Sequence, residues 1–149
     1  MVTKTASKAM RLFDSGYNCA EAVLIALSEK LAQKNAVIPR IATGFGGGVG
    51  RSGSVCGALS GAVMAIGLLR GCDKAEEKEK RYAVYDEVLQ MVKEFEKEFG
   101  SSQCKTLTQC DLRTEKGRKK FYGQEVRKKV CPKFVGWCAD YVAKGRSLA

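Results

Sequence analysis

Apolar residues recur every three or four positions along most of the chain, and this spacing constrains the fold more than any other feature. No segment shows the sustained two-residue alternation of a half-buried strand. The 149 residues are enough for one domain with its own hydrophobic core. We therefore predict a single all-α domain over residues 1–149, a bundle of about five helices with a glycine-rich loop before the third.

The helix boundaries follow from capping residues and from glycine and proline. Asn18, followed three residues later by Glu21, has the pattern of a capping box and places Cys19 at the first position of the second helix. Pro132 is a favoured first-turn residue, so we predict that the last helix begins there. The other helices are predicted over residues 3–15, 54–70 and 75–99, with short helical turns near 103–107 and 116–122. The first two should form a hairpin, and the fourth carries its apolar face on Tyr82, Tyr85, Leu89, Val92, Phe95 and Phe99.

A glycine-rich loop over residues 44–53 contains one match to G-x-G-x-x-G, at Gly48, Gly50 and Gly53. A dinucleotide-binding loop of this type follows a β-strand, whereas residues 38–43 have the pattern of a helical turn. We expect instead a tight loop that brings backbone N–H groups close to a group above Cys56. The candidate cofactor-binding residues of this loop are Gly46, Gly47, Gly48, Gly50 and Arg51.

The chain contains seven cysteines and no histidine. The absence of histidine excludes a Ser-His-Asp or Cys-His catalytic centre, a histidine zinc site and a histidine-ligated haem. The first residues lack the apolar segment of a secretory signal, and residues 55–69 are too short and too interrupted to span a bilayer, so we expect a cytoplasmic protein without membrane contact. In that reducing compartment the cysteines are expected to serve as thiols, metal ligands or redox centres.

The cysteines fall into two classes by their predicted positions. Four are expected at helix starts, where the helix dipole favours the thiolate that binds metals and performs redox chemistry. These candidate redox or metal-ligating residues are Cys19, Cys56, Cys104 and Cys131. Of the others, Cys72 follows a helix end, Cys138 lies on an apolar face, and Cys110 lies in a loop close enough in sequence to be an accessory to Cys104. No C-x-x-C pair is present, so ligands would have to converge from separate helices.

The positive charge is concentrated in the last third of the chain. The net charge is +10, and residues 101–149 contain 12 basic against 4 acidic side chains. Such a surplus favours an anionic partner: an acidic protein, a nucleic acid or an anionic cluster held inside the protein. Aromatic residues that could stack on bases are few here, and no nucleic-acid-binding motif accompanies the charge, so nucleic acid ranks last.

These motifs together resemble the bacterial and archaeal redox-active family called C_GCAxxG_C_C. The resemblance rests on residues 18–21, 44–51 and 56–61, then Cys104 and Cys131-Pro132, and it spans nearly the whole chain. Its four cysteines correspond to the four already selected, although the order here is Cys56-Gly57-Ala58 instead of Gly-Cys-Ala. The resemblance implies a redox role. A similarity to the cluster-binding part of split-Soret cytochrome c implies an iron–sulfur cluster, without the haem, since no C-x-x-C-H is present.

Three functional hypotheses follow. The first is an electron-transfer or redox-accessory protein in which the four cysteines ligate an iron–sulfur cluster and an acidic protein is the redox partner. The second is a metal-free thiol–disulfide protein. The third is a basic nucleic-acid-binding module. The sequence leaves open whether the chain is an enzyme and whether it forms a homo-oligomer.

Overall fold

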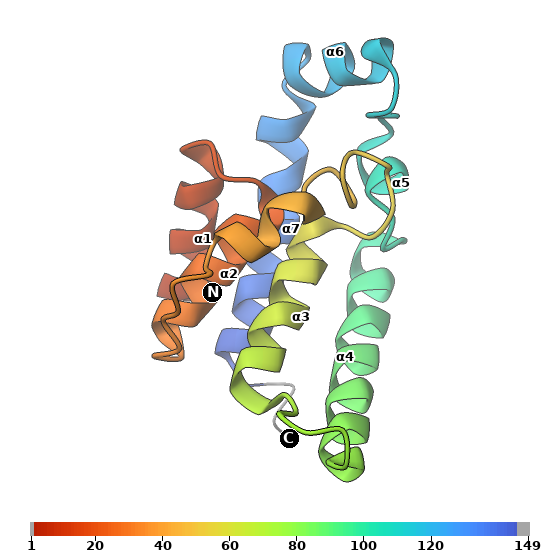
Figure 1. Cartoon of the computed structure of the whole chain (residues 1–149). Coiled ribbons are helices and arrows are strands. Elements are labelled where there is room, and N and C mark those ends of the chain that lie inside the picture. Colours follow the sequence, from red (N-terminus) through yellow and green to blue (C-terminus); the bar gives the residue numbers. More distant parts are fainter. Residues whose placement is uncertain (1, 146–149) are drawn as a thin grey trace.

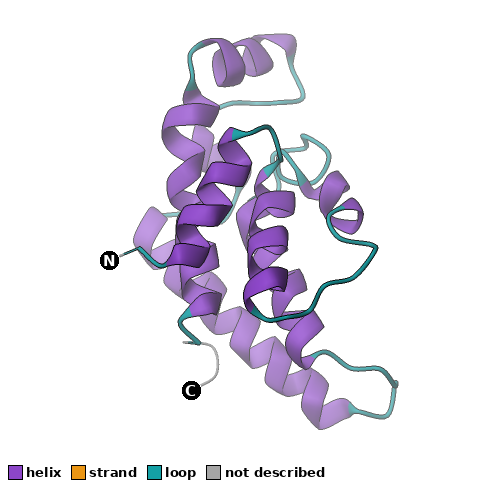
Figure 2. Ribbon diagram, turned by 90° about the vertical axis from the view of Figure 1, so that its left-hand side faces the viewer, coloured by secondary structure: helices purple, strands orange, loops and turns teal. Residues whose placement is uncertain are grey.

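The computed structural model describes residues 2–145, which form an all-α fold (Figure 1). Its helices are α1 (Lys4–Asp14), α2 (Cys19–Lys30), the 3₁₀-helix η1 (Arg40–Phe45), α3 (Gly57–Arg70), α4 (Lys78–Phe99), α5 (Cys104–Thr108), α6 (Glu115–Gly123) and α7 (Val126–Ala143). Within this described part there is no strand, as Figure 2 shows, and the one isolated β-bridge joins Val55 to Gln103. The all-α prediction is confirmed, but about five helices was too few. The additional helices α5 and α6 lie at the predicted helical turns, and η1 overlaps the turn pattern of residues 38–43; all three are short and bury one or two residues each.

Local capping forms the α1–α2 hairpin as predicted. Thr3 caps α1 by accepting a hydrogen bond from the Ala6 backbone N–H. The Asn18 side chain accepts from the Glu21 N–H at 2.9 Å, and the Glu21 carboxylate accepts from the Asn18 N–H at the same distance. This reciprocal capping box fixes the first turn of α2, and therefore the position of Cys19.

The core lies where α2 and α3 pack against each other and α7 packs against both as well as against α1. Gly61 of α3 approaches α2 so closely that a Cβ there would lie 2.6 Å from the carbonyl oxygen of Ala20. Leucine and isoleucine side chains on both sides are fully buried. Close backbone approach of these two helices brings their N-terminal ends together. Among the described residues, no helix is both long and apolar enough to cross a membrane.

Two predictions about the later helices were wrong. The last helix begins at Val126, and Pro132 lies inside it, between the buried residues Cys131 and Phe134. In α4, Tyr82, Tyr85 and Leu89 are more than half exposed instead of lying on a buried face. α4 packs mainly through its C-terminal half, where Phe95 and Phe99 meet α7 aromatic rings. In the described part of the chain, no element covers the face of α4 that carries Tyr82, Tyr85 and Leu89.

Candidate functional site

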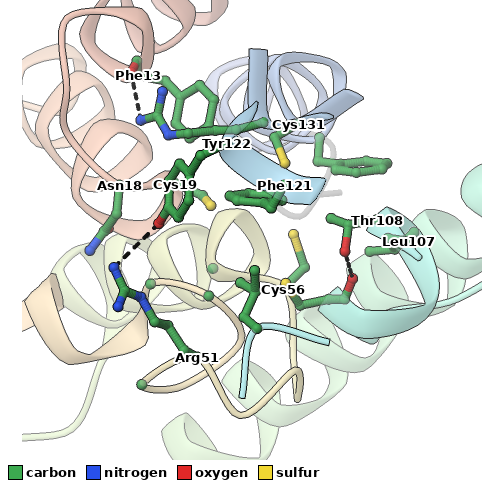
Figure 3. A pocket seen from close by; sticks show the side chains of 18 of the residues that line it. Phe13, Asn18, Cys19, Arg51, Cys56, Leu107, Thr108, Phe121, Tyr122 and Cys131 are labelled. Carbon is green, nitrogen blue, oxygen red and sulfur yellow. Dashed lines mark hydrogen bonds between the residues drawn. The ribbon is translucent and has the colours of Figure 1, made fainter. Parts of the chain in front are cut away.

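A cavity of about 360 Å³ lies at the end of the bundle where α2, α3, α5 and α7 meet the glycine-rich loop. Its wall includes four cysteines, which we call the cavity cysteines: Cys19, Cys56, Cys104 and Cys131. Figure 3 shows the sulfurs of Cys19 and Cys131 facing the same space from different helices. The structure therefore brings together the four cysteines that the sequence singled out.

Helix starts position three of the four. Cys19 is the first residue of α2, Cys56 is the N-cap of α3, and Cys104 is the first residue of α5. The Cys56 side chain makes no capping hydrogen bond, but the nearby backbone N–H groups of Ala58 and Leu59 lower the pKa of its thiol. Cys131 is different, because α7 begins five residues before it. Its placement at a helix start was wrong, and Cys131 reaches the cavity from the interior of α7.

Two backbone hydrogen bonds place Cys56 and Cys104 side by side. The Cys56 N–H donates to the carbonyl of Ser102 at 2.8 Å, and the Cys104 N–H donates to the carbonyl of Ser54 at 2.7 Å. This short antiparallel contact ties the segment before α3 to the segment before α5. It therefore sets the separation of two cavity cysteines through main-chain geometry.

The glycine-rich loop covers the cavity. Gly46, Gly47, Gly50 and Arg51 line it, and the Gly47 backbone N–H lies close enough to Cys19 to lower the pKa of its thiol. Gly48 does not line the cavity but packs behind Cys104: a Cβ on Gly48 would lie 2.6 Å from the Cys104 Cβ. The loop thus brings a backbone N–H group close to Cys19, and it also supports a second cysteine, Cys104, from behind.

Burial dominates the electrostatics of the cavity cysteines. Desolvation raises the pKa of all four thiols, that of Cys104 to about 11. Neighbouring cysteine sulfurs raise the pKa values of Cys56, Cys104 and Cys131 further, because two thiolates in one cavity repel each other. The expectation that helix starts alone would favour thiolates was therefore wrong. The backbone N–H groups lower the pKa less than burial raises it, so the isolated thiols stay protonated at neutral pH.

Arg127 supplies a fixed positive charge at the cavity wall. Its Nη2 donates to the carbonyl oxygens of Phe13 at 2.9 Å and Tyr17 at 2.8 Å, and its guanidinium lies 3.8 Å from the centre of the Phe13 ring. This charge lowers the pKa values of Cys19 and Cys131, opposing the effect of burial. Arg127 is therefore held where it stabilises negative charge on the two cysteines nearest to it.

Sequence analysis missed the rest of the cavity wall. Apolar side chains complete the wall. They come from α1, α5, α6, α7 and the segment between α5 and α6: Phe13, Leu107, Leu112, Phe121 and Phe134. Asn18 and Tyr122 line it as well, and the Arg51 guanidinium donates to the Tyr122 hydroxyl at 3.4 Å, joining the loop to α6 (Figure 3). No local pattern marks the apolar residues as part of a cavity wall, because they come from elements far apart in the sequence.

The other three cysteines lie outside this cavity. Cys138 is fully buried on the apolar face of α7, as predicted, and Cys72 follows the end of α3. Cys110 is buried between α5 and α6 and lies near enough to Cys104 to raise its pKa. The accessory position predicted for Cys110 is therefore compatible with its location, while Cys72 and Cys138 remain separate.

The donor set of the cavity determines what it can hold. Among the described residues, no group of three or more cysteine, aspartate or glutamate side chains is arranged to hold a single metal ion. The four cavity cysteines instead surround a space of about 360 Å³. In an iron–sulfur cluster the protein sulfurs are distributed over two or more irons, so its ligands surround a volume instead of converging on one point. The residues present fit such a group.

The protein is thus a small helical protein in which four cysteines line one cavity. The chain belongs to the family described as "Putative redox-active protein (C_GCAxxG_C_C)", whose sequence pattern matches residues 17–144. The match includes all four cavity cysteines and the glycine-rich loop. The resemblance inferred from the sequence is confirmed.

The comparison with individual proteins adds one relative. A protein of Archaeoglobus fulgidus described as "Uncharacterized protein" is 36% identical over 66 residues. The aligned part covers 44% of this chain and 44% of that relative's length. No solved structure matches the chain.

Proposed function

We propose that the cavity cysteines hold an iron–sulfur cluster and that the protein has an electron-transfer or redox-accessory role. The observation that carries this proposal is the convergence of four cysteines, from four separate segments, on one cavity of about 360 Å³. The family description, which names redox activity, supports it. When bound, such a cluster accepts and releases single electrons.

The residues of this chain are suited to an anionic group at that place. Backbone N–H groups lie close enough to Cys19 and Cys56 to lower the pKa values of their thiols, and N–H groups that hydrogen-bond ligand sulfurs help to set the potential of a cluster. Arg127 contributes positive charge beside Cys19 and Cys131. The apolar walls limit water around the site. The raised thiol pKa values mean that ligation must release protons, since the thiolate is the ligand.

Anaerobic purification followed by reconstitution with iron and sulfide tests the proposal. We expect brown protein with broad visible absorption, stoichiometric iron and sulfide, and an electron paramagnetic resonance signal in one oxidation state. Colourless, iron-free protein after reconstitution would refute the cluster. Thiol titration before and after mild oxidation then distinguishes the metal-free alternative, in which cysteine pairs form disulfides and lose two thiols for each bond formed.

A further inference from the structure

The segment that covers the cavity carries an exposed apolar surface. Five of its large apolar residues are 37–58% exposed, and we call them the loop face: Val37, Ile41, Phe45, Val49 and Val55. Four of them follow at intervals of four residues, and backbone hydrogen bonds join Ile41 to Val37 and Val49 to Phe45. Clustered exposed apolar residues of this kind mark interaction sites more often than isolated ones do.

Val49 occupies a backbone conformation that β-branched residues rarely adopt. Its φ is +67°, in the left-handed region, where valine is disfavoured and asparagine is tolerated. Its side chain is nevertheless 45% exposed, so burial of this side chain within the chain does little to offset the strain. An apolar side chain held at the surface at a conformational cost is consistent with a role in contact with another molecule.

The charge around the loop face selects the kind of partner. Residues 31–72 contain no aspartate or glutamate, while Arg40 and Arg51 lie within the loop-face segment itself. Glu21, which accepts a hydrogen bond from Thr43, is already engaged in the cap of α2. On the other side, Arg51 contacts Tyr122 of α6, a helix with four lysine and arginine residues. The face is therefore apolar with a basic surround.

A second copy of this chain fits the face poorly, because each copy has a net charge of +10 and the two would repel. The geometry points to a different occupant: we propose that the loop face is the docking surface for a small acidic electron-carrier protein. The inference rests on the proposed function, since Thr43, Gly46 and Gly50, which lie between the loop-face residues in the sequence, line the cysteine cavity. Protein interfaces of this type combine an apolar centre with complementary charge at the rim, which speeds encounter and fixes orientation.

The α4 surface provides a matched control. Tyr85 and Leu89 are 60% and 52% exposed, like the loop-face residues, but lie on α4 in a segment with charges of both signs. The test compares Ile41→Gln/Val49→Asn with Tyr85→Gln/Leu89→Gln. Each pair removes two exposed apolar side chains and leaves the net charge unchanged. Asparagine at position 49 suits the left-handed backbone, so we expect an unchanged or higher Tm.

The probe is a small acidic ferredoxin, whose Kd is measured by calorimetry. We expect wild-type binding at about 50 mM NaCl that weakens several-fold at about 200 mM, as screening predicts. The loop-face variant should bind about tenfold more weakly, and the α4 variant as the wild type does. Absence of binding at low salt, equal binding by the wild type and the loop-face variant, or equal weakening by both variants would overturn the proposal. So would a wild-type dimer that the loop-face substitutions convert to monomer, since the occupant would then be a second copy.

The docking test and the cluster test fail independently. Ferredoxin binding does not require the site to be loaded, so it is measured on protein of known iron content. Iron-free protein that binds ferredoxin through the loop face would refute the cluster and retain the docking surface. Iron-loaded protein that does not bind ferredoxin would refute the docking surface and retain the cluster.

Discussion

Replacement of Gly48 by alanine tests how the loop supports the cavity. Gly48 has a φ of +68°, and a Cβ there would lie 2.6 Å from the Cys104 Cβ and from the Ser54 carbonyl oxygen. A non-glycine residue in this conformation costs about 1–2 kcal/mol. Relieving contacts with backbone adds about 1–3 kcal/mol, as in other overpacked sites. Alanine also restricts the unfolded chain, which returns about 0.4–1 kcal/mol. We therefore expect Gly48→Ala to lower the free energy of unfolding by about 1–4.5 kcal/mol.

Two neighbouring glycines separate the contributions. Gly50 has a φ of +59° but no atom within 4 Å of its would-be Cβ, so Gly50→Ala should cost only about 0.5–1.5 kcal/mol. Gly44 has neither a positive φ nor a close neighbour, and Gly44→Ala should be neutral or stabilising by up to about 1 kcal/mol. Urea denaturation of the metal-free proteins measures all three.

The same series tests the site. Relief of the clash at position 48 must move Cys104, so Gly48→Ala should also retain less iron after reconstitution, whereas Gly50→Ala and Gly44→Ala should retain as much as the wild type. Equal destabilisation by Gly48→Ala and Gly50→Ala would show that the contact with Cys104 is not tight. A destabilised Gly48→Ala protein with full iron content would show that Cys104 does not depend on the loop.

Three further outcomes are expected. Alanine at any cavity cysteine should abolish cofactor retention. Cys138→Ala should cost about 1–2 kcal/mol of stability and Cys72→Ala almost nothing, and both variants should retain the cofactor. Iron and thiols per chain, measured for alanine substitutions of all seven cysteines, decide whether four cysteines are needed for the cofactor and three are not. In metal-free protein, alkylation of Cys104 should accelerate up to about pH 11, where burial places its pKa. Because the unfolded thiol ionises near pH 8.5, the folded state should lose stability between that pH and about 11; a rate that levels off below about pH 9 would contradict this. Gly61→Ala, whose Cβ would lie 2.6 Å from the Ala20 carbonyl oxygen, should cost about 1–3 kcal/mol in urea denaturation, and an unchanged midpoint would mean that α2 and α3 are not in close contact.

Signals that act over a few residues were readable from the sequence. The Asn18–Glu21 capping box and the end of α4 before Gly100 lie as predicted, because each depends on a hydrogen bond or a backbone conformation within one or two helical turns. The choice of four cysteines followed from similar local reasoning, and the structure places all four at one cavity. For Cys131 the reasoning was wrong, since α7 continues through Pro132.

Only the tertiary structure decided what surrounds those cysteines and how they ionise. The Arg127 guanidinium donates a hydrogen bond to the carbonyl oxygen of Phe13, 114 residues away, and no periodicity or motif encodes such a contact. Burial, which raises the thiol pKa values, depends likewise on how α1, α5, α6 and α7 close over the cavity. The exposure of Tyr82 has the same origin, because an apolar stripe is buried only where another element packs against it. Sequence patterns determine helices and their ends, whereas desolvation is a property of the assembled bundle and arises only when distant segments exclude water together.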